Sequence, residues 1–139
     1  MSQEDLWSDT RTVFARQLED DLAVWSLRTG ISVEVWALPK TEISSRVSTV
    51  VQNVIRDVLD QVGWETRART VSLALTATPH GLRLTISNDD GGLTSEAFEH
   101  RLRAQRAELA EFGGRLTING VAGEGTTVGV VVPQQAIAG

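Results

Sequence analysis

The stretch TVSLALTATPHGLRLTIS, residues 70–87, decides the fold. Apolar residues alternate with small or polar ones on both sides of Pro79-His80-Gly81. Because successive side chains of a strand point to opposite faces, this pattern predicts two strands that each bury one face. The short turn joins them as an antiparallel β-hairpin. The chain is therefore built on a sheet with an apolar face that other elements must cover.

Amphipathic helices are predicted on both sides of this hairpin. The segment 43–62 carries one apolar stripe at helical spacing, formed by Ile43, Val47, Val50, Val51, Val54, Val58 and Val62. After the hairpin, the loop Asn88-Asp89-Asp90-Gly91-Gly92 breaks the strand pattern. A helix over 95–112 follows, with Thr94 or Ser95 as its N-cap and Gly113-Gly114 at its C-terminal end.

The outer parts of the chain complete the pattern. Residues 3–28 predict a helix that ends before Gly30, and 31–36 alternate as a strand. Residues 116–121 and 126–132 predict a last strand pair. The order is helix, strand, helix, hairpin, helix, hairpin. This order predicts an α+β two-layer sandwich, a mixed and mostly antiparallel sheet with its helices on one face.

Composition restricts the class of protein. The chain has 139 residues, 41% of them apolar, which suits one domain over 1–139 with a loose tail at 134–139. It has no cysteine and no apolar run long enough to span a membrane, and its acidic start does not resemble a signal peptide. The net charge of −5 argues against nucleic acid or an anionic membrane surface as a partner. We therefore expect a soluble cytoplasmic domain without direct membrane contact.

The order of elements and several local motifs resemble the Bergerat-type ATPase fold (GHKL), which histidine kinases share with DNA gyrase and MutL. The stretch RTGISV, residues 28–33, is similar to the segment that opens the ATPase domain of nitrate-sensor-like histidine kinases. The similarity extends from about Leu18 to Pro133. It implies binding of ATP with Mg²⁺, and phosphoryl transfer to a histidine on another domain in two-component signalling.

The first motif lies in the helix predicted over 43–62. The family's N box has two polar residues four positions apart, and the second of them is a magnesium ligand. Asn53 and Asp57 occupy these positions, so the resemblance assigns both to the metal and the nucleotide. The sequence departs from the family at Asp60 and Gln61, where basic residues are usual. The alternative reading is the solvated polar edge of an amphipathic helix.

The second motif, Asp-x-Gly-x-Gly in the family, follows the hairpin, and its Asp binds the adenine amino group. Strand parity aligns that Asp with Asn88, whose side-chain carbonyl can accept the same bond. A shift of one residue would use Asp89 instead. Asp90 replaces the first glycine, and Gly92 remains. The alternative reading is an ordinary acidic turn rich in glycine.

The third motif, Gly-x-Gly-Leu in the family, cradles phosphates with backbone amides. Counting back from Gly113-Gly114 aligns it with Glu99-His100-Arg101-Leu102, of which Leu102 alone matches. The nearby arginines Arg101, Arg103 and Arg106 offer side-chain contacts to phosphate, or form a solvated basic face.

The last motif, G-x-G-T in the family, is intact. It is formed by Gly123, Gly125 and Thr126, and the resemblance places that threonine near adenine. A simple β-turn kept for folding would show the same residues.

A histidine kinase also needs a phosphoacceptor histidine on a dimerising helical hairpin. His80 lies in the predicted turn and His100 near the family's ATP lid, so neither fits that role. The resemblance therefore implies a partner: a dimerisation and phosphoacceptor domain, a response regulator, or a second copy of the chain. The helix over 3–28, which carries Trp7 and Trp25, is either the stub of such a hairpin or the first helix of the domain.

Three functions stay open at this stage. The first is the ATP-binding catalytic domain of a sensor histidine kinase. The second is a degenerate relative, a pseudokinase that binds no nucleotide and serves as a protein-interaction module. The third is a serine kinase of the anti-sigma type, which shares the ATPase fold.

Overall fold

The computed structural model describes residues 12–65, 68–89, 95–121 and 123–133, and it contains one five-stranded sheet there. Its strands are β1 (Ser32–Ala37), β2 (Thr70–Thr78), β3 (Gly81–Asn88), β4 (Arg115–Val121) and β5 (Gly125–Val132). They lie in the order β1-β2-β3-β5-β4. The pair β1 and β2 is parallel, and the other three pairs are antiparallel. The predicted mixed, mostly antiparallel sheet is confirmed.

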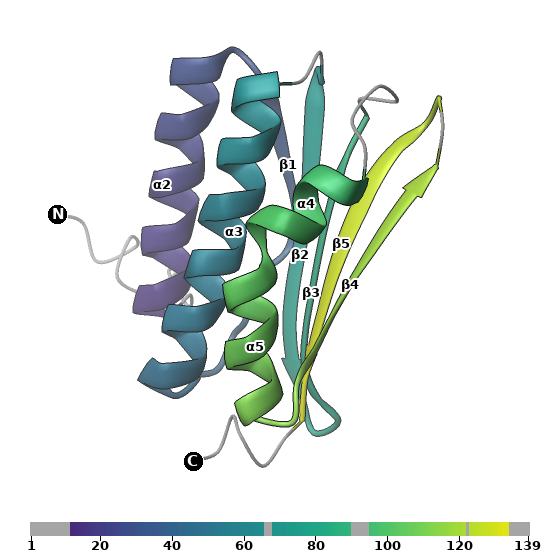
Figure 1. Cartoon of the computed structure of the whole chain (residues 1–139). Helices are drawn as coiled ribbons and strands as arrows, with labels where there is room; N and C mark the ends of the chain where they lie inside the picture. Colours follow the sequence, from purple (N-terminus) through teal and green to yellow (C-terminus); the bar gives the residue numbers. More distant parts are fainter. Residues whose placement is uncertain (1–11, 66–67, 90–94, 122, 134–139) are drawn as a thin grey trace, which may run out of the picture.

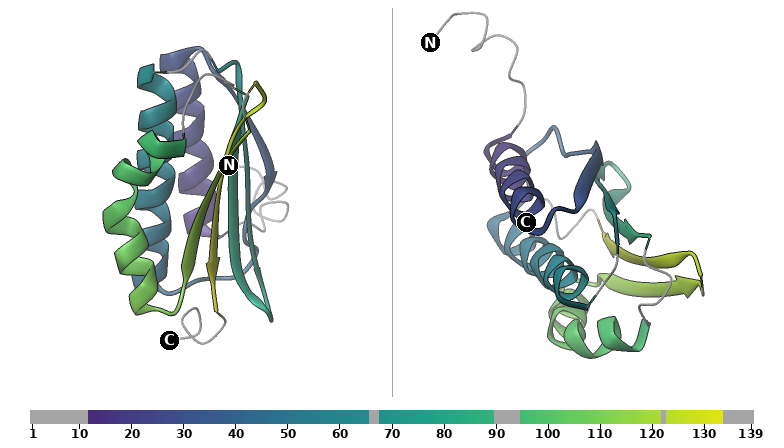
Figure 2. Two further views of the ribbon diagram at one scale, coloured as in Figure 1. Left: turned by 45° about the vertical axis from the view of Figure 1, so that its right-hand side comes forward. Right: turned by 90° about the horizontal axis from the view of Figure 1, so that it is seen from above.

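The helices gather on one face of this sheet (Figures 1 and 2). They are α2 (Val13–Thr29), α3 (Ser45–Glu65), α4 (Ser95–Arg101) and α5 (Arg103–Glu111). The view from above in Figure 2 shows the helices as one layer and the strands as the other, so the predicted α+β sandwich is confirmed. Among the described residues, no helix combines the length and the apolarity that crossing a membrane requires.

The core lies between these two layers, and the β2–β3 hairpin forms the sheet side of it. In the β2–β3 register, Leu73 pairs with Ile86 and Leu75 with Leu84, and all four side chains are fully buried. The valine stripe predicted on α3 is buried against them from Val47 to Val62. Burying each such side chain contributes roughly 1.5–3 kcal/mol. Burial thus stabilises a helix whose β-branched residues have modest helix propensity.

Within the described residues, the N-terminal helix α2 begins at Val13, after Thr12 as its N-cap. Residues 3–11, which include Trp7, lie outside the described part of the chain. Thr12 has extended backbone, and its side-chain oxygen accepts a hydrogen bond of 3.0 Å from the amide of Ala15. The prediction of a helix that runs through Thr12 is therefore wrong. A threonine whose side chain caps the first turn fixes where the helix begins, whatever the apolar periodicity before it suggests.

The helix predicted over 95–112 is broken in the structure. Leu102 adopts φ −97° and ψ 11°, and it separates α4 from α5. Phe98 and Leu109, one on each side of the break, are both buried to about 1% exposure or less. Core packing thus overrides a continuous helical pattern. The predicted C-terminal end is confirmed, because the amide of Gly114 donates a 2.8 Å hydrogen bond to the carbonyl of Leu109.

Candidate functional site

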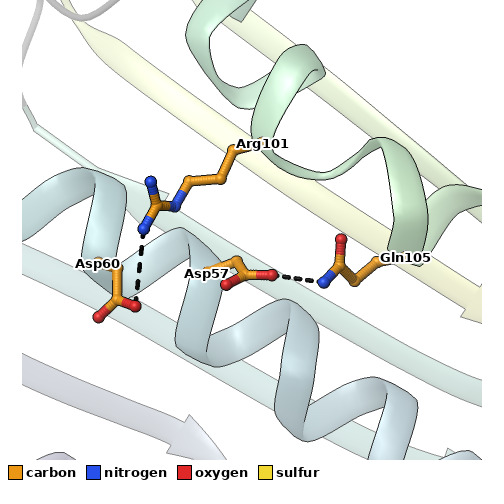
Figure 3. A network of polar contacts seen from close by, with 4 residues as sticks. All are labelled: Asp57, Asp60, Arg101 and Gln105. Atoms are coloured by element: carbon orange, nitrogen blue, oxygen red, sulfur yellow. Dashed lines mark hydrogen bonds and ion pairs between the residues drawn. The ribbon is translucent and has the colours of Figure 1, made fainter.

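The predicted magnesium residues lie one turn apart on α3, and both have partners within the protein. Asn53 accepts a 3.1 Å hydrogen bond from Nη2 of Arg56, at an exposed position. Asp57 is partly buried, and its Oδ2 accepts a hydrogen bond from Nε2 of Gln105 on α5 (Figure 3). The side of Asp57 that faces α5 is therefore bonded to a side chain 48 residues later in the chain.

A second polar contact joins the same two parts of the molecule. Nη2 of Arg101 lies 3.7 Å from Oδ2 of Asp60, beside the Gln105–Asp57 pair (Figure 3). Asp60 and Arg101 are both positions at which the sequence departs from the family pattern. In the structure the carboxylate of Asp60 lies beside the guanidinium of Arg101, so the opposite charges of these two residues neutralise each other. The pair is about one-third exposed, so it contributes little free energy by itself.

Arg106 also has a carboxylate partner, so it does not offer an unpaired charge to the predicted phosphate position. Its Nη2 lies 2.9 Å from Oε2 of Glu99, which joins α5 to α4. Of the basic residues that the sequence offers for phosphate, Arg101 and Arg106 thus have carboxylate partners already, and Arg103 is exposed.

Burial raises the pKa of Asp57 above its ordinary value of 3.8. The positive charge of Arg101 opposes this shift, the negative charge of Asp60 adds to it, and Arg56 again lowers the pKa. The ionised carboxylate is therefore partly desolvated, and the nearby positive charges compensate only part of the cost of that desolvation. A pKa raised in the folded state means that folding favours the protonated form. The contribution of Asp57 to stability is present below its unfolded pKa and is lost as pH rises through the folded pKa.

We expect Asp57→Asn to remove this pH dependence while keeping the hydrogen bond from Gln105. Near pH 3 the variant and the wild type should have similar melting temperatures, and toward pH 7 the variant should become the more stable by a small margin. Thermal melting across this pH range measures the difference. Asp20→Asn, at an exposed position on α2, is the matched control. A difference between Asp57→Asn and the wild type that stays constant with pH would contradict the raised pKa.

The predicted adenine end of the site lies where β3 and β5 pair. Asn88 is the register partner of Thr126, and both are buried on the helix-facing side of the sheet. Nδ2 of Asn88 lies 3.4 Å from the carbonyl oxygen of Thr126. Oγ1 of Thr126 is buried and has no hydrogen-bond partner among the described residues. A buried hydroxyl without a partner is costly, and such groups commonly face a water or a ligand.

Asp89, the residue that the shifted alignment assigns to adenine, lies beside the start of β2 in the structure. Its Oδ1 accepts hydrogen bonds from the backbone amides of Arg69, at 2.8 Å, and of Thr70, at 3.2 Å. This carboxylate therefore anchors the start of β2. Strand parity correctly predicted that Asn88, not Asp89, is on the buried side. Gly92 lies outside the described residues, and Gly123 lies in the exposed turn before β5.

Leu102 is buried to 1% exposure beside Phe98, which is fully buried. The one residue that matches the family's Gly-x-Gly-Leu motif thus serves the core. Sequence reasoning did not single out Phe98 or Gln105. Gln105 follows Arg101 by four residues, a spacing that places both on one helix face, but nothing in the sequence indicates that this face meets α3.

The residues predicted for Mg²⁺ are engaged with protein partners in the structure. Among the described residues, no group of three or more His, Cys, Asp or Glu side chains is close enough to hold a metal ion. Magnesium is usually held by one or two carboxylates together with substrate phosphates and water. Asp57 is instead bonded to an amide donor, and the guanidinium of Arg101 lies beside it. No step of phosphoryl transfer follows from this geometry.

Comparison with known proteins agrees with the architecture. The chain superimposes on the histidine kinase domain of a blue-light-activated histidine kinase from Erythrobacter litoralis with a TM-score of 0.68, over 90% of this chain and at 17% identity. The fold is that of histidine kinase domains. A structure of the Erythrobacter litoralis kinase itself gives a TM-score of 0.71 over 89% of the chain at 17% identity. The Acinetobacter baumannii histidine kinase AdeS gives 0.63 over 86% at 9% identity.

These similarities concern the fold alone, because the identities are low. The chain covers 64%, 43% and 62% of the three matched chains, respectively. No protein-family model matches the sequence, and no curated protein matches it.

Proposed function

We propose that the chain is a histidine-kinase-type ATPase domain of two-component signalling that acts as a protein-interaction module rather than as a catalyst. One observation carries this proposal: α4 and α5 are joined to α3 by Gln105–Asp57 and Arg101–Asp60 at the predicted phosphate end of the site. The groups that would hold Mg²⁺ and phosphate instead hold the two parts of the domain together.

The chemistry of the phosphate end supports the same conclusion. Backbone amides can cradle phosphate when glycines let it approach. Here Glu99, which would repel phosphate, and Arg101 stand at the glycine positions, and both are engaged in ion pairs. The protein partners that suit such a module are a dimerisation and phosphoacceptor domain, a response regulator, or a second copy of this chain. His80 and His100 are exposed in a turn and on α4, so a phosphoacceptor would belong to the partner.

A second candidate function is the binding of ATP as a kinase catalytic domain. Two buried atoms favour it: Oγ1 of Thr126 and Oε1 of Gln105 have no hydrogen-bond partner within the described residues. They belong to the predicted adenine end and phosphate end, respectively. A nucleotide that displaced Gln105 from Asp57 would give both regions new partners.

Calorimetric titration with a non-hydrolysable ATP analogue, with and without Mg²⁺, distinguishes the two functions. We expect no heat at millimolar ligand from a protein whose thermal melting confirms that it is folded. Binding that depends on Mg²⁺ in the micromolar range, roughly −8 kcal/mol, would overturn the proposal and support the catalytic reading.

Variants make the titration sharper. If the second candidate is right, Asp57→Ala should abolish the dependence on Mg²⁺, and Thr126→Val should weaken binding of the adenine end with or without the metal. The double variant Arg101→Gly/Gln105→Ala tests the reason given for the module proposal, which is that contacts to α3 close the site. The variant removes both of these contacts. It should therefore gain measurable nucleotide binding if the two contacts alone close the site.

A further inference from the structure

The face of the sheet that points away from the helices carries a hollow over β3, β5 and β4. Figure 2 shows that the helices cover the other face. On β3 and β5, the side chains of the open face are exposed or half-buried, whereas their neighbours along each strand are buried. The hollow has a volume of about 360 Å³, and its lining includes Arg83, Thr85, Arg115, Thr117 and Gly129. None of the residues predicted for nucleotide binding lines it.

The sheet register places two arginines on either side of one valine. Val131 pairs with Arg83 on β3 and with Arg115 on β4, so the three residues form one row across the sheet. Because neighbouring strands lie about 4.8 Å apart, the Cα atoms of the two arginines are roughly 10 Å apart. Both arginines are exposed and line the same hollow. Their guanidinium groups can therefore approach one ligand from opposite sides.

A glycine opens the floor of the hollow beside this row. Gly129 pairs with Thr85 on β3 and with Thr117 on β4. A Cβ atom at Gly129 would lie 2.9 Å from Oγ1 of Thr117, so this hydroxyl borders the space above the glycine. Threonine hydroxyls can donate hydrogen bonds as well as accept them. The hollow thus offers hydrogen-bond donors around an open centre.

The charges at the hollow are all of one sign. Among the described residues, its lining contains two arginines and no Asp or Glu. Within the same part of the chain, no carboxylate forms an ion pair with either guanidinium. The chain as a whole carries a net charge of −5, so this is a positive surface on an acidic protein. Because guanidinium groups bind carboxylates through paired, charge-assisted hydrogen bonds, the hollow is complementary to an acidic ligand.

Val131 distinguishes between the possible acidic occupants. Its side chain is 42% exposed, in the row between the two arginines. A free phosphate would leave this valine in water, whereas a protein segment can cover it with an aliphatic side chain while its carboxylates meet the arginines. A second copy docked face to face would bring the arginines of both copies together, and like charges repel. A different protein with an acidic segment therefore fits this surface best.

We propose that the hollow over β3, β5 and β4 binds an acidic segment of a partner protein, with carboxylates on Arg83 and Arg115 and an aliphatic residue against Val131. This inference rests on the proposed function as a protein-interaction module, and it adds the surface and the chemistry of the partner. Asn88 and Thr126 lie on the opposite, helix-facing side of the sheet. The partner segment and a nucleotide would therefore occupy different faces.

NMR titration of the isotope-labelled full-length chain tests this inference. The probe is the synthetic peptide Glu-Ala-Val-Ala-Glu with blocked ends. Alternate residues of an extended peptide point to one side, so both glutamates and the valine can face the row of two arginines and a valine. We expect saturable shifts of the backbone amide signals of Thr85, Thr117 and Gly129, with a Kd of roughly 1 mM. The control peptide Gln-Ala-Val-Ala-Gln should cause no such shifts.

Charge-removing variants make the titration specific. Arg83→Gln/Arg115→Gln should weaken binding of the glutamate peptide roughly tenfold or more, because both charge-assisted contacts are lost. Since both arginines are exposed, the variant should keep the melting temperature of the wild type. The matched control Arg28→Gln/Lys40→Gln removes the same charge at exposed positions that do not line the hollow. It should leave binding within about twofold of the wild type.

The outcomes separate the occupants. Binding of the glutamate peptide that is lost in Arg83→Gln/Arg115→Gln and kept in the control variant supports the inference. No shift at millimolar peptide, or a shift that the double variant does not weaken, would overturn it. Inorganic phosphate that causes the same shifts at the same concentration would overturn it in favour of a free-anion site. Self-association of the chain that the double variant abolishes would assign the face to a second copy.

The proposed function and this inference can fail separately. Nucleotide binding that depends on Mg²⁺ would overturn the function as a module, and it is measured without the peptide. Loss of peptide binding in a folded chain that also ignores nucleotide would overturn the docking surface alone.

Discussion

Gly125→Ala is expected to destabilise the fold strongly. Gly125 begins β5 with φ +130°, a conformation that side chains rarely adopt. A Cβ atom there would lie 2.0 Å from the backbone oxygen of Asn88 and 3.0 Å from its carbonyl carbon. The obstacle is backbone, so no side chain can turn away to relieve the clash. Strain and overlap together should cost more than about 3 kcal/mol, a large share of the 5–15 kcal/mol that stabilises a typical domain.

Gly123→Ala is the matched control for this prediction. Gly123 also has positive φ, at +84°, but a Cβ atom there would meet nothing within 4 Å. The control should lose only about 1 kcal/mol, from backbone conformation alone. Denaturant unfolding compares the two variants. Equal losses would show that the close approach of β5 to Asn88 does not determine the glycine, and that the G-x-G-T motif is kept here for another reason.

Phe98→Ala is expected to lower the free energy of unfolding by about 3–5 kcal/mol, as large aromatic deletions in a core do. Phe98 is the largest of the fully buried side chains, and α4 has no other residue buried to this degree. Its loss removes the apolar contact that holds α4 against the rest of the domain. The Arg101–Asp60 pair is too exposed to replace that contact.

Denaturant unfolding monitored by circular dichroism measures this effect. The neighbouring substitution Glu99→Ala, at an exposed position, should change stability by less than about 1 kcal/mol, because it removes one surface ion pair with Arg106. If Phe98→Ala left the unfolding midpoint unchanged, α4 would not belong to the cooperative unit. The closure of the predicted phosphate end would then be a loose contact and not part of the fold.

The fold was largely predictable because its signals are local. The alternation over 70–87 predicted which side chains of the hairpin are buried, and parity placed Asn88 on the buried side. The stripe on α3 was equally clear. The errors occurred where a local interaction or the core outweighed periodicity. Thr12 caps the start of α2 with its own side chain, and Leu102 breaks the helix between Phe98 and Leu109.

The candidate site was less predictable, because its decisive contacts join distant parts of the chain. Asp57 and Gln105 are 48 positions apart, and Asp60 and Arg101 are 41. In the sequence, Asp60 and Arg101 each appear as a separate departure from a phosphate site. Their pairing depends on the packing of α4 and α5 against α3, which no local pattern specifies.

The sequence by itself therefore determined the elements, their buried faces and the resemblance to the histidine kinase ATPase fold. The reason is that apolar residues recur every two residues in strands and every 3.6 in helices, and both periods can be read directly from the chain. The tertiary structure alone decided what the polar residues of the site bind. Burial partly desolvates Asp57, Gln105 occupies its carboxylate, and Thr126 keeps a buried hydroxyl without a partner among the described residues. These are properties of the space between helices and sheet, and that space exists only once the two layers have packed.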